Sequence, residues 1–128
     1  MEHIDLTQAE WRLMEALWDH APQTGRELTE QMAAQTGWNR STTLTLLRRL
    51  MEKGAVCCDA QGRKNVFYPA VRREEAAAQQ TRDLLGRVYN GSLSLLVSEM
   101  AKRETLPQRE IDELYALLQD MEEKKRHG

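Results

Sequence analysis

The sequence predicts a mainly α-helical fold with a small β-hairpin, the wing of a winged helix-turn-helix domain, followed by a lobe made only of helices. Three observations lead to this prediction. Apolar residues recur at three- and four-residue spacing along most of the chain, which is typical of helices that bury one face. Residues 55–68 interrupt this spacing with strand formers around a glycine turn. Aromatic residues make up only 5% of the chain, which leaves little material for a large β core.

Two capping boxes predict where the first two helices begin. They are Thr-Gln-Ala-Glu at residues 7–10 and Thr-Gly-Arg-Glu at residues 24–27. In such a box the threonine hydroxyl accepts a hydrogen bond from the glutamate amide, and the glutamate side chain reaches back to the threonine amide. The first helix is expected to end before Pro22 and the second near Gly37.

The third predicted helix, residues 39–54, has a core-like face and a polar face. The core-like positions follow i, i+3, i+4, i+7 spacing and are Thr43, Leu46, Leu47 and Leu50. A step of about 100° per residue places Ser41, Thr45 and Arg48 on the opposite side. Hydroxyls and amides can hold phosphates, and arginine can bind a guanine edge, so this face suits a major-groove reader. An ordinary solvated helix face is the alternative.

A β-hairpin is predicted directly after the third helix. Residues 55–59 and 66–68 are strand formers, and the turn between them carries Arg63 and Lys64. Three short helices followed by a hairpin form a winged helix-turn-helix domain. The wing tip would lie beside the sugar-phosphate backbone or the minor groove, whereas a solvated basic turn is the alternative.

Charge is distributed unevenly along the chain. The net charge is −2, which by itself argues against a nucleic-acid-binding protein. Residues 36–73, however, hold eight Lys or Arg against two Asp or Glu, a balance of +6, and the rest of the chain has a balance of −8. This asymmetry is expected when one face meets phosphate and the remainder keeps the protein soluble.

The second lobe, residues 73–128, is predicted to contain only helices and to follow a DNA-binding domain in residues 1–72. Residues 90–92 break the first helix, Pro107 opens the last, and the charged residues 122–128 are expected to fray. Helices with one apolar stripe need a partner surface, and because the winged-helix domain has its own core the sequence predicts a homodimer. Folding of the lobe back onto the winged-helix domain is the alternative. The expected interface residues are Leu84, Val88, Leu93, Leu96, Val97, Met100, Ile111, Leu114 and Leu118.

The sequence lacks the motifs of an enzyme. Its three histidines, His3, His20 and His127, are scattered, and no nucleophile motif, phosphate-binding loop or zinc-protease motif is present. No cofactor or metal is predicted. The adjacent Cys57 and Cys58 leave open a metal- or redox-responsive protein, although metal sites favour separated ligands. A winged helix used for protein contacts and a regulator that senses a small molecule are further alternatives.

The chain is expected to act in the cytoplasm. No apolar run approaches the roughly 20 residues that span a bilayer, so no membrane insertion is predicted. The acidic N-terminus lacks the charged and apolar regions of a signal peptide. The two cysteines are expected to be reduced thiols, because a disulfide between neighbours would be strained.

Several segments resemble one known family when their order and spacing are taken together. They are LTQAEW at residues 6–11, LW at 17–18, STTLTLLRRL at 41–50, KG at 53–54, GR at 62–63, FYP at 67–69 and YNGS at 89–92. The chain thereby resembles the penicillinase-repressor (BlaI/MecI) family of winged-helix transcriptional regulators. The resemblance implies a homodimeric repressor of a palindromic operator of the TACA/TGTA type. It also implies a membrane-bound sensor metalloprotease as a partner, with release from DNA through cleavage in the dimerisation lobe.

The polar face of the third helix and the basic hairpin turn lead to a hypothesis on the roles of individual residues. Those expected to face the bases are Ser41, Thr42, Leu44, Thr45 and Arg48, and those expected to hold phosphates are Arg40, Arg49, Arg63 and Lys64. Thr43 and Leu44 depart from the family, which commonly has an aliphatic residue at the first position and often a basic or polar one at the second. Leu44 could contact a thymine methyl group instead. The family's Asn-Phe cleavage site aligns with Glu99 and Met100, and the Cys-x-Cys motifs of copper-responsive relatives are absent, since no cysteine follows Cys58.

Overall fold

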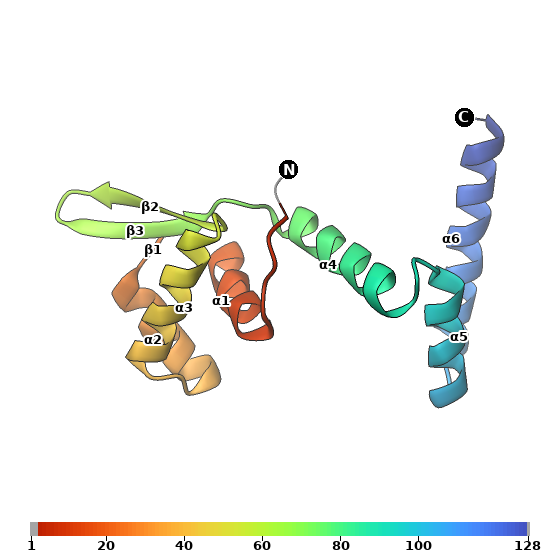
Figure 1. Ribbon diagram of the computed structural model, residues 1–128, viewed down its shortest axis with the longest axis horizontal. Helices are drawn as coiled ribbons and strands as arrows, with labels where there is room; N and C mark the ends of the chain where they lie inside the picture. Colours follow the sequence, from red (N-terminus) through yellow and green to blue (C-terminus); the bar gives the residue numbers. More distant parts are fainter. Residues whose placement is uncertain (1–2, 128) are drawn as a thin grey trace. The chain divides into compact units, whose positions relative to one another are not determined.

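The computed structural model describes residues 3–127, which form helices and one small antiparallel sheet (Figure 1). The elements in chain order are α1 (Gln8–Asp19), β1 (Gln23–Thr24), α2 (Gly25–Thr36), α3 (Arg40–Glu52), β2 (Val56–Gln61), β3 (Lys64–Pro69), α4 (Arg73–Val88), α5 (Leu93–Arg103) and α6 (Gln108–His127). The predicted class, mainly α with a β-wing, is confirmed. None of the described helices is long and apolar enough to cross a membrane.

The chain divides into two compact units, and the division lies inside α4. The first unit extends to Thr81 and the second begins at Arg82. The predicted domain boundary after residue 72 lies directly before α4, whereas packing in the first unit continues further along that helix. Gln79 is buried and its Nε2 donates a hydrogen bond to the Ile4 carbonyl oxygen at 3.0 Å. This contact ties the first turns of α4 to the N-terminal segment of the same unit.

Both predicted capping boxes are present. At α1 the Thr7 hydroxyl accepts from the Glu10 amide at 3.2 Å, and the Thr7 amide donates to Glu10 Oε1 at 2.8 Å. At α2 the same two bonds join Thr24 and Glu27 at 3.1 and 3.0 Å. These bonds satisfy amides at the start of each helix that have no partner inside it. The helix starts are therefore set by local sequence.

The ends of α3 also follow from local chemistry. Asn39 caps the N-terminus, with its Oδ1 accepting from the Thr42 amide at 2.8 Å. Gly54, just after the capping residue Lys53, has φ +82°, a conformation that side chains disfavour and that glycine adopts freely. The predicted core face is confirmed, since the four buried residues of α3 are Thr43, Leu46, Leu47 and Leu50.

The sheet contains more than the predicted hairpin. Strands β2 and β3 are longer than expected and join through a two-residue loop, in which Gly62 has φ +67° as tight hairpin turns require. Strand β1 pairs with β3, with Gln23 opposite Phe67, so the order is β1-β3-β2. The sequence did not predict β1, because two residues are too few to show an alternating pattern. The buried Gln23 side chain links β1 to the end of α1, since its Nε2 donates hydrogen bonds to the carbonyl oxygens of Ala16 and His20.

Thr43 is a polar residue inside an apolar core. Its side chain is fully buried, and its hydroxyl oxygen has no hydrogen-bond partner among the described residues. We expect Thr43→Val to raise the free energy of unfolding by about 1 kcal/mol, because a methyl group fills the same space without a desolvated hydroxyl. Urea unfolding of the full chain measures the effect, with the half-buried Thr45→Val as control. An unchanged or lower stability would contradict the prediction.

The second unit contains the end of α4 together with α5 and α6. The predicted break is confirmed, since Asn90 and Gly91 have φ +52° and +80° and the Ser92 hydroxyl caps α5 through the Leu95 amide at 3.2 Å. The expected fraying of the charged tail is wrong as far as His127, because α6 continues to that residue. Ion pairs one turn apart, such as Lys124 with Asp120 at 3.2 Å, accompany the extra turns. Residue 128 lies outside the described residues.

Candidate nucleic-acid interface

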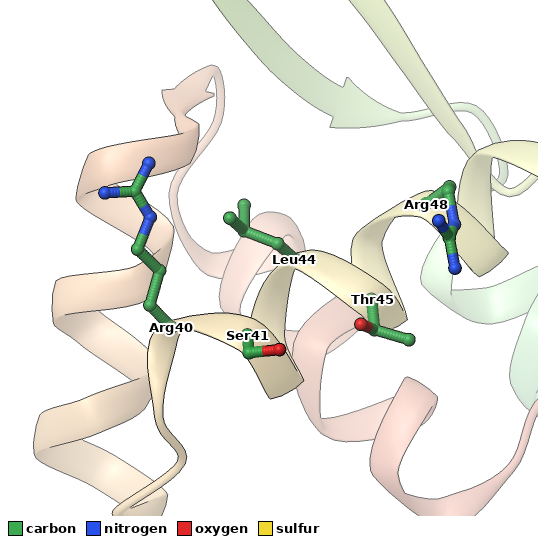
Figure 2. Close-up of a pocket in the computed structure, with 5 residues that line it drawn as sticks. All are labelled: Arg40, Ser41, Leu44, Thr45 and Arg48. Atoms are coloured by element: carbon green, nitrogen blue, oxygen red, sulfur yellow. The ribbon is translucent and has the colours of Figure 1, made fainter.

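The outer face of α3 gathers five side chains around an open hollow of about 640 Å³. They are Arg40, Ser41, Leu44, Thr45 and Arg48 (Figure 2). All come from one helix, whose opposite face is buried in the first unit. The core therefore fixes which side of α3 faces outward, and the hollow combines two guanidinium groups, two hydroxyls and one leucine.

Four of the five residues expected to face the bases line this hollow. Thr42 is exposed but does not line it, and its amide is engaged by the Asn39 cap. Arg40, which was expected to hold a phosphate, also lines the hollow. Arg49 is exposed but does not line it. The hollow thus brings together most of the predicted reading residues and one predicted phosphate contact.

Arg48 is an accessible candidate for base recognition. Its side chain is 68% exposed, and its Nε lies 3.9 Å from Oε1 of Glu52, one helical turn away. An exposed ion pair at this distance is weak in free energy, so it does not prevent the guanidinium from binding another acceptor. A planar guanidinium can donate two parallel hydrogen bonds to the O6 and N7 atoms of guanine.

The wing tip carries the other two predicted phosphate contacts. Arg63 is the second residue of the β2–β3 loop, and Lys64 is the first residue of β3. Both side chains are exposed. Because the loop has only two residues, the paired strands hold both cations at one end of the hairpin.

Lys53, the C-cap residue of α3, binds the N-terminal part of the chain. Its Nζ donates to Oε1 of Glu10 at 2.6 Å and to the Asp5 carbonyl oxygen at 2.7 Å. Glu10 is 1% exposed, and its other carboxylate oxygen has no partner among the described residues. Sequence reasoning gave Glu10 only its capping role, because the cation that it binds lies 43 residues away.

The Glu10 carboxylate makes stability depend on pH. Burial raises its pKa, but hydrogen bonds from Lys53 and Thr7 and the Lys53 charge outweigh burial, so the pKa lies below the ordinary 4.5. The stabilisation from this group is therefore complete above about pH 4.5 and is lost as the pH falls through the lower, folded-state pKa. We expect Glu10→Gln to reduce the fall in the free energy of unfolding toward acidic pH, measured by urea unfolding from about pH 3 to pH 7. Glu15→Gln, at an exposed position of α1, is the matched control. If the stability of Glu10→Gln fell toward acidic pH as steeply as that of the wild type, the assignment would be contradicted.

The residues expected to form the dimer interface lie at or near the surface of their helices. Leu84, Val88, Leu93, Met100 and Leu118 are between 39% and 54% exposed. The other four are half-buried: Leu96, Val97, Ile111 and Leu114. Further exposed apolar residues, outside the set expected to form the interface, are Leu95, Tyr115, Leu117 and Met121. Among the described residues of α5 and α6, no side chain is buried.

The two cysteines that could bind a metal or respond to oxidation lie next to each other in β2. Cys57 and Cys58 are free, half-buried and exposed respectively, and neighbouring residues of a strand point to opposite faces. This geometry does not direct both sulfur atoms at one ion.

Glu99 and Met100, the candidate cleavage site, lie inside α5, where Glu99 pairs with Arg103 at 2.5 Å.

Helices α1 to α3, with a polar and basic face on the third and a hairpin with a cationic tip, define a winged helix-turn-helix domain, a class of DNA-binding domain. The penicillinase repressor family profile matches residues 6–120. The chain therefore belongs to the penicillinase repressor family, whose members are transcriptional repressors and not enzymes.

Individual relatives agree with this membership. The penicillinase repressor of Bacillus licheniformis is 28% identical over 121 residues, 94% of each chain. The methicillin resistance regulatory protein MecI of Staphylococcus aureus (strain N315) is 26% identical over 114 residues, 89% of this chain and 93% of that protein. A solved structure of B. licheniformis BlaI, in its monomeric form with the blaP half-operator, matches with a TM-score of 0.53 and 28% identity over 59% of this chain and 93% of that one.

Proposed function

We propose that this chain is a homodimeric transcriptional repressor that places α3 in the major groove of a palindromic operator of the TACA/TGTA type. In this proposal Ser41, Thr45 and Arg48 face the bases, while Arg63 and Lys64 hold phosphates. The observation that carries it is the outer face of α3, where guanidinium and hydroxyl groups gather on a helix whose other face is buried. The B. licheniformis relative solved with a half-operator supports the same use of the domain.

Dimerisation is proposed because the second unit leaves apolar side chains uncovered. Leu93 and Leu118 are each 50% exposed and Val88 is 54% exposed, which is unfavourable in water. A second copy of the same lobe would cover them symmetrically. Two joined chains would present two α3 helices to half-sites about one helical turn of DNA apart.

Salt dependence of binding tests the DNA-binding proposal. Each phosphate contact that displaces counterions makes the logarithm of the binding constant fall by about 0.9 per logarithmic unit of salt concentration. Fluorescence anisotropy with a labelled duplex from the promoter region of the protein's own gene measures this slope. Binding that does not change with salt would instead favour a winged helix used for protein contacts.

Arg48→Ala is expected to weaken operator binding by roughly 1–3 kcal/mol and to relax preference at one base step, because two hydrogen bonds to a guanine edge are lost. Lys64→Ala is the matched control and should weaken binding to operator and random duplexes alike, since phosphates are the same in every sequence. Anisotropy titrations with both duplexes measure the two effects. An equal loss on both duplexes from Arg48→Ala would refute its role in base reading.

Release by proteolysis is the regulatory part of the proposal. A bond inside α5 must leave the helix before a protease can bind it, and α5 has no buried residue among those described, so local opening costs little. A membrane-bound sensor metalloprotease is the proposed partner. Coexpression with a metalloprotease encoded beside this gene should give a fragment that ends at Glu99, as detected by mass spectrometry. An intact chain after induction would contradict this step.

A further inference from the structure

Leu44 is a large apolar side chain among polar ones on the outer face of α3. It is 36% exposed and lies in the hollow with Arg40, Ser41, Thr45 and Arg48 (Figure 2). About 100° per residue places it between the two arginines around the helix axis. It is not one of the four buried residues of α3, which lie on the opposite face.

The end of the Leu44 side chain lies against neighbouring structure. A Cβ atom built on Gly25 would lie 3.8 Å from Leu44 Cδ2 and 3.7 Å from Phe67 Cε2. One methyl group of Leu44 and the edge of the Phe67 ring therefore both lie near Gly25, the first residue of α2. A side chain supported in this way loses little conformational freedom on binding, which favours a defined contact over a mobile one.

The chemistry of the major groove limits what such a side chain can recognise. Base edges there present hydrogen-bond donors and acceptors, and the thymine 5-methyl group is the only apolar feature. A cytosine amino group covered by leucine would lose its water without gaining an acceptor, which is unfavourable. An apolar residue at a base-facing position consequently selects thymine.

We propose that Leu44 contacts the 5-methyl group of a thymine in each half-site and thereby sets thymine preference at that step. The inference rests on the proposed function, because it requires α3 in the major groove. It adds to that function that the protein recognises the base at one step through a van der Waals contact between Leu44 and the thymine methyl group.

Replacing thymine by deoxyuridine tests the contact, since the two bases differ only in the 5-methyl group. The probe is the duplex that the wild-type protein enriches most from a randomised library, with each thymine replaced singly. We expect one position in each half-site at which wild-type affinity falls about fourfold, the value of one buried methyl group. Leu44→Ala should show no loss at that position, whereas Leu44→Met, which keeps an apolar side chain, should retain it.

Cytosine and 5-methylcytosine at the same step provide the converse test. Cytosine should weaken wild-type binding, and its 5-methyl derivative should restore part of the affinity for wild type but not for Leu44→Ala. Sequence-specific binding with the same deoxyuridine profile in wild type and Leu44→Ala would overturn the inference and leave the proposed function intact. Failure to enrich any duplex over random DNA would overturn both.

Discussion

Leu118→Asp is expected to convert the protein from a dimer to a monomer and to lower operator affinity by about 10²- to 10⁴-fold. Leu118 is 50% exposed on α6, so a charge there is tolerated in the single chain. In the proposed dimer the same carboxylate would be buried against apolar side chains without a partner, which is strongly unfavourable. The large loss on DNA follows because two linked half-site contacts combine through effective concentration, and a monomer retains only one of them.

The dimer prediction has a matched control on the same helix. Ala116→Asp introduces the same side chain two residues earlier, about 200° away around the axis and off the apolar stripe. It should remain a dimer and bind the operator as the wild type does. Sedimentation equilibrium gives the mass, and anisotropy with full and half operators gives the affinity. A dimeric Leu118→Asp variant would place the interface elsewhere, and a monomeric wild type would refute dimerisation.

Lys53→Met is expected to lower the free energy of unfolding by about 2–3 kcal/mol, because it leaves the buried Glu10 carboxylate without its cation. Breaking a buried ion pair by removing one partner costs roughly 3–5 kcal/mol. Here 34% of the Lys53 side chain is exposed, so water can partly replace the ammonium group and the lower value is expected. The Asp5 carbonyl oxygen loses its donor as well, which loosens the segment before α1.

The double variant Glu10→Gln/Lys53→Met is the control for this assignment. It removes both charges while keeping side chains of similar size, so it should be more stable than Lys53→Met alone. Urea unfolding at neutral pH measures all three proteins. If Lys53→Met unfolds like the wild type, or if the double variant is no more stable than the single one, the ion pair does not stabilise the first unit.

Local sequence determined most of the elements of this protein. The two capping boxes fixed the starts of α1 and α2, because their hydrogen bonds join residues only three positions apart. Periodicity identified the buried face of α3 and, with it, the opposite face that carries Ser41, Thr45 and Arg48. Sequence order and turn chemistry predicted the wing and its cationic tip. Resemblance to the penicillinase-repressor family then linked these elements to a function.

Features that join distant parts of the chain were decided by the tertiary structure. Strand β1 exists only because β3 lies beside it, and two residues carry no pattern of their own. The ion pair of Lys53 with Glu10 joins residues distant in sequence, so local patterns did not predict it. The extension of the first unit into α4 likewise depends on packing between separate segments. The physical reason is that hydrogen bonds along a helix are set by neighbouring residues, whereas burial and ion pairing are set by whatever the folded chain brings alongside.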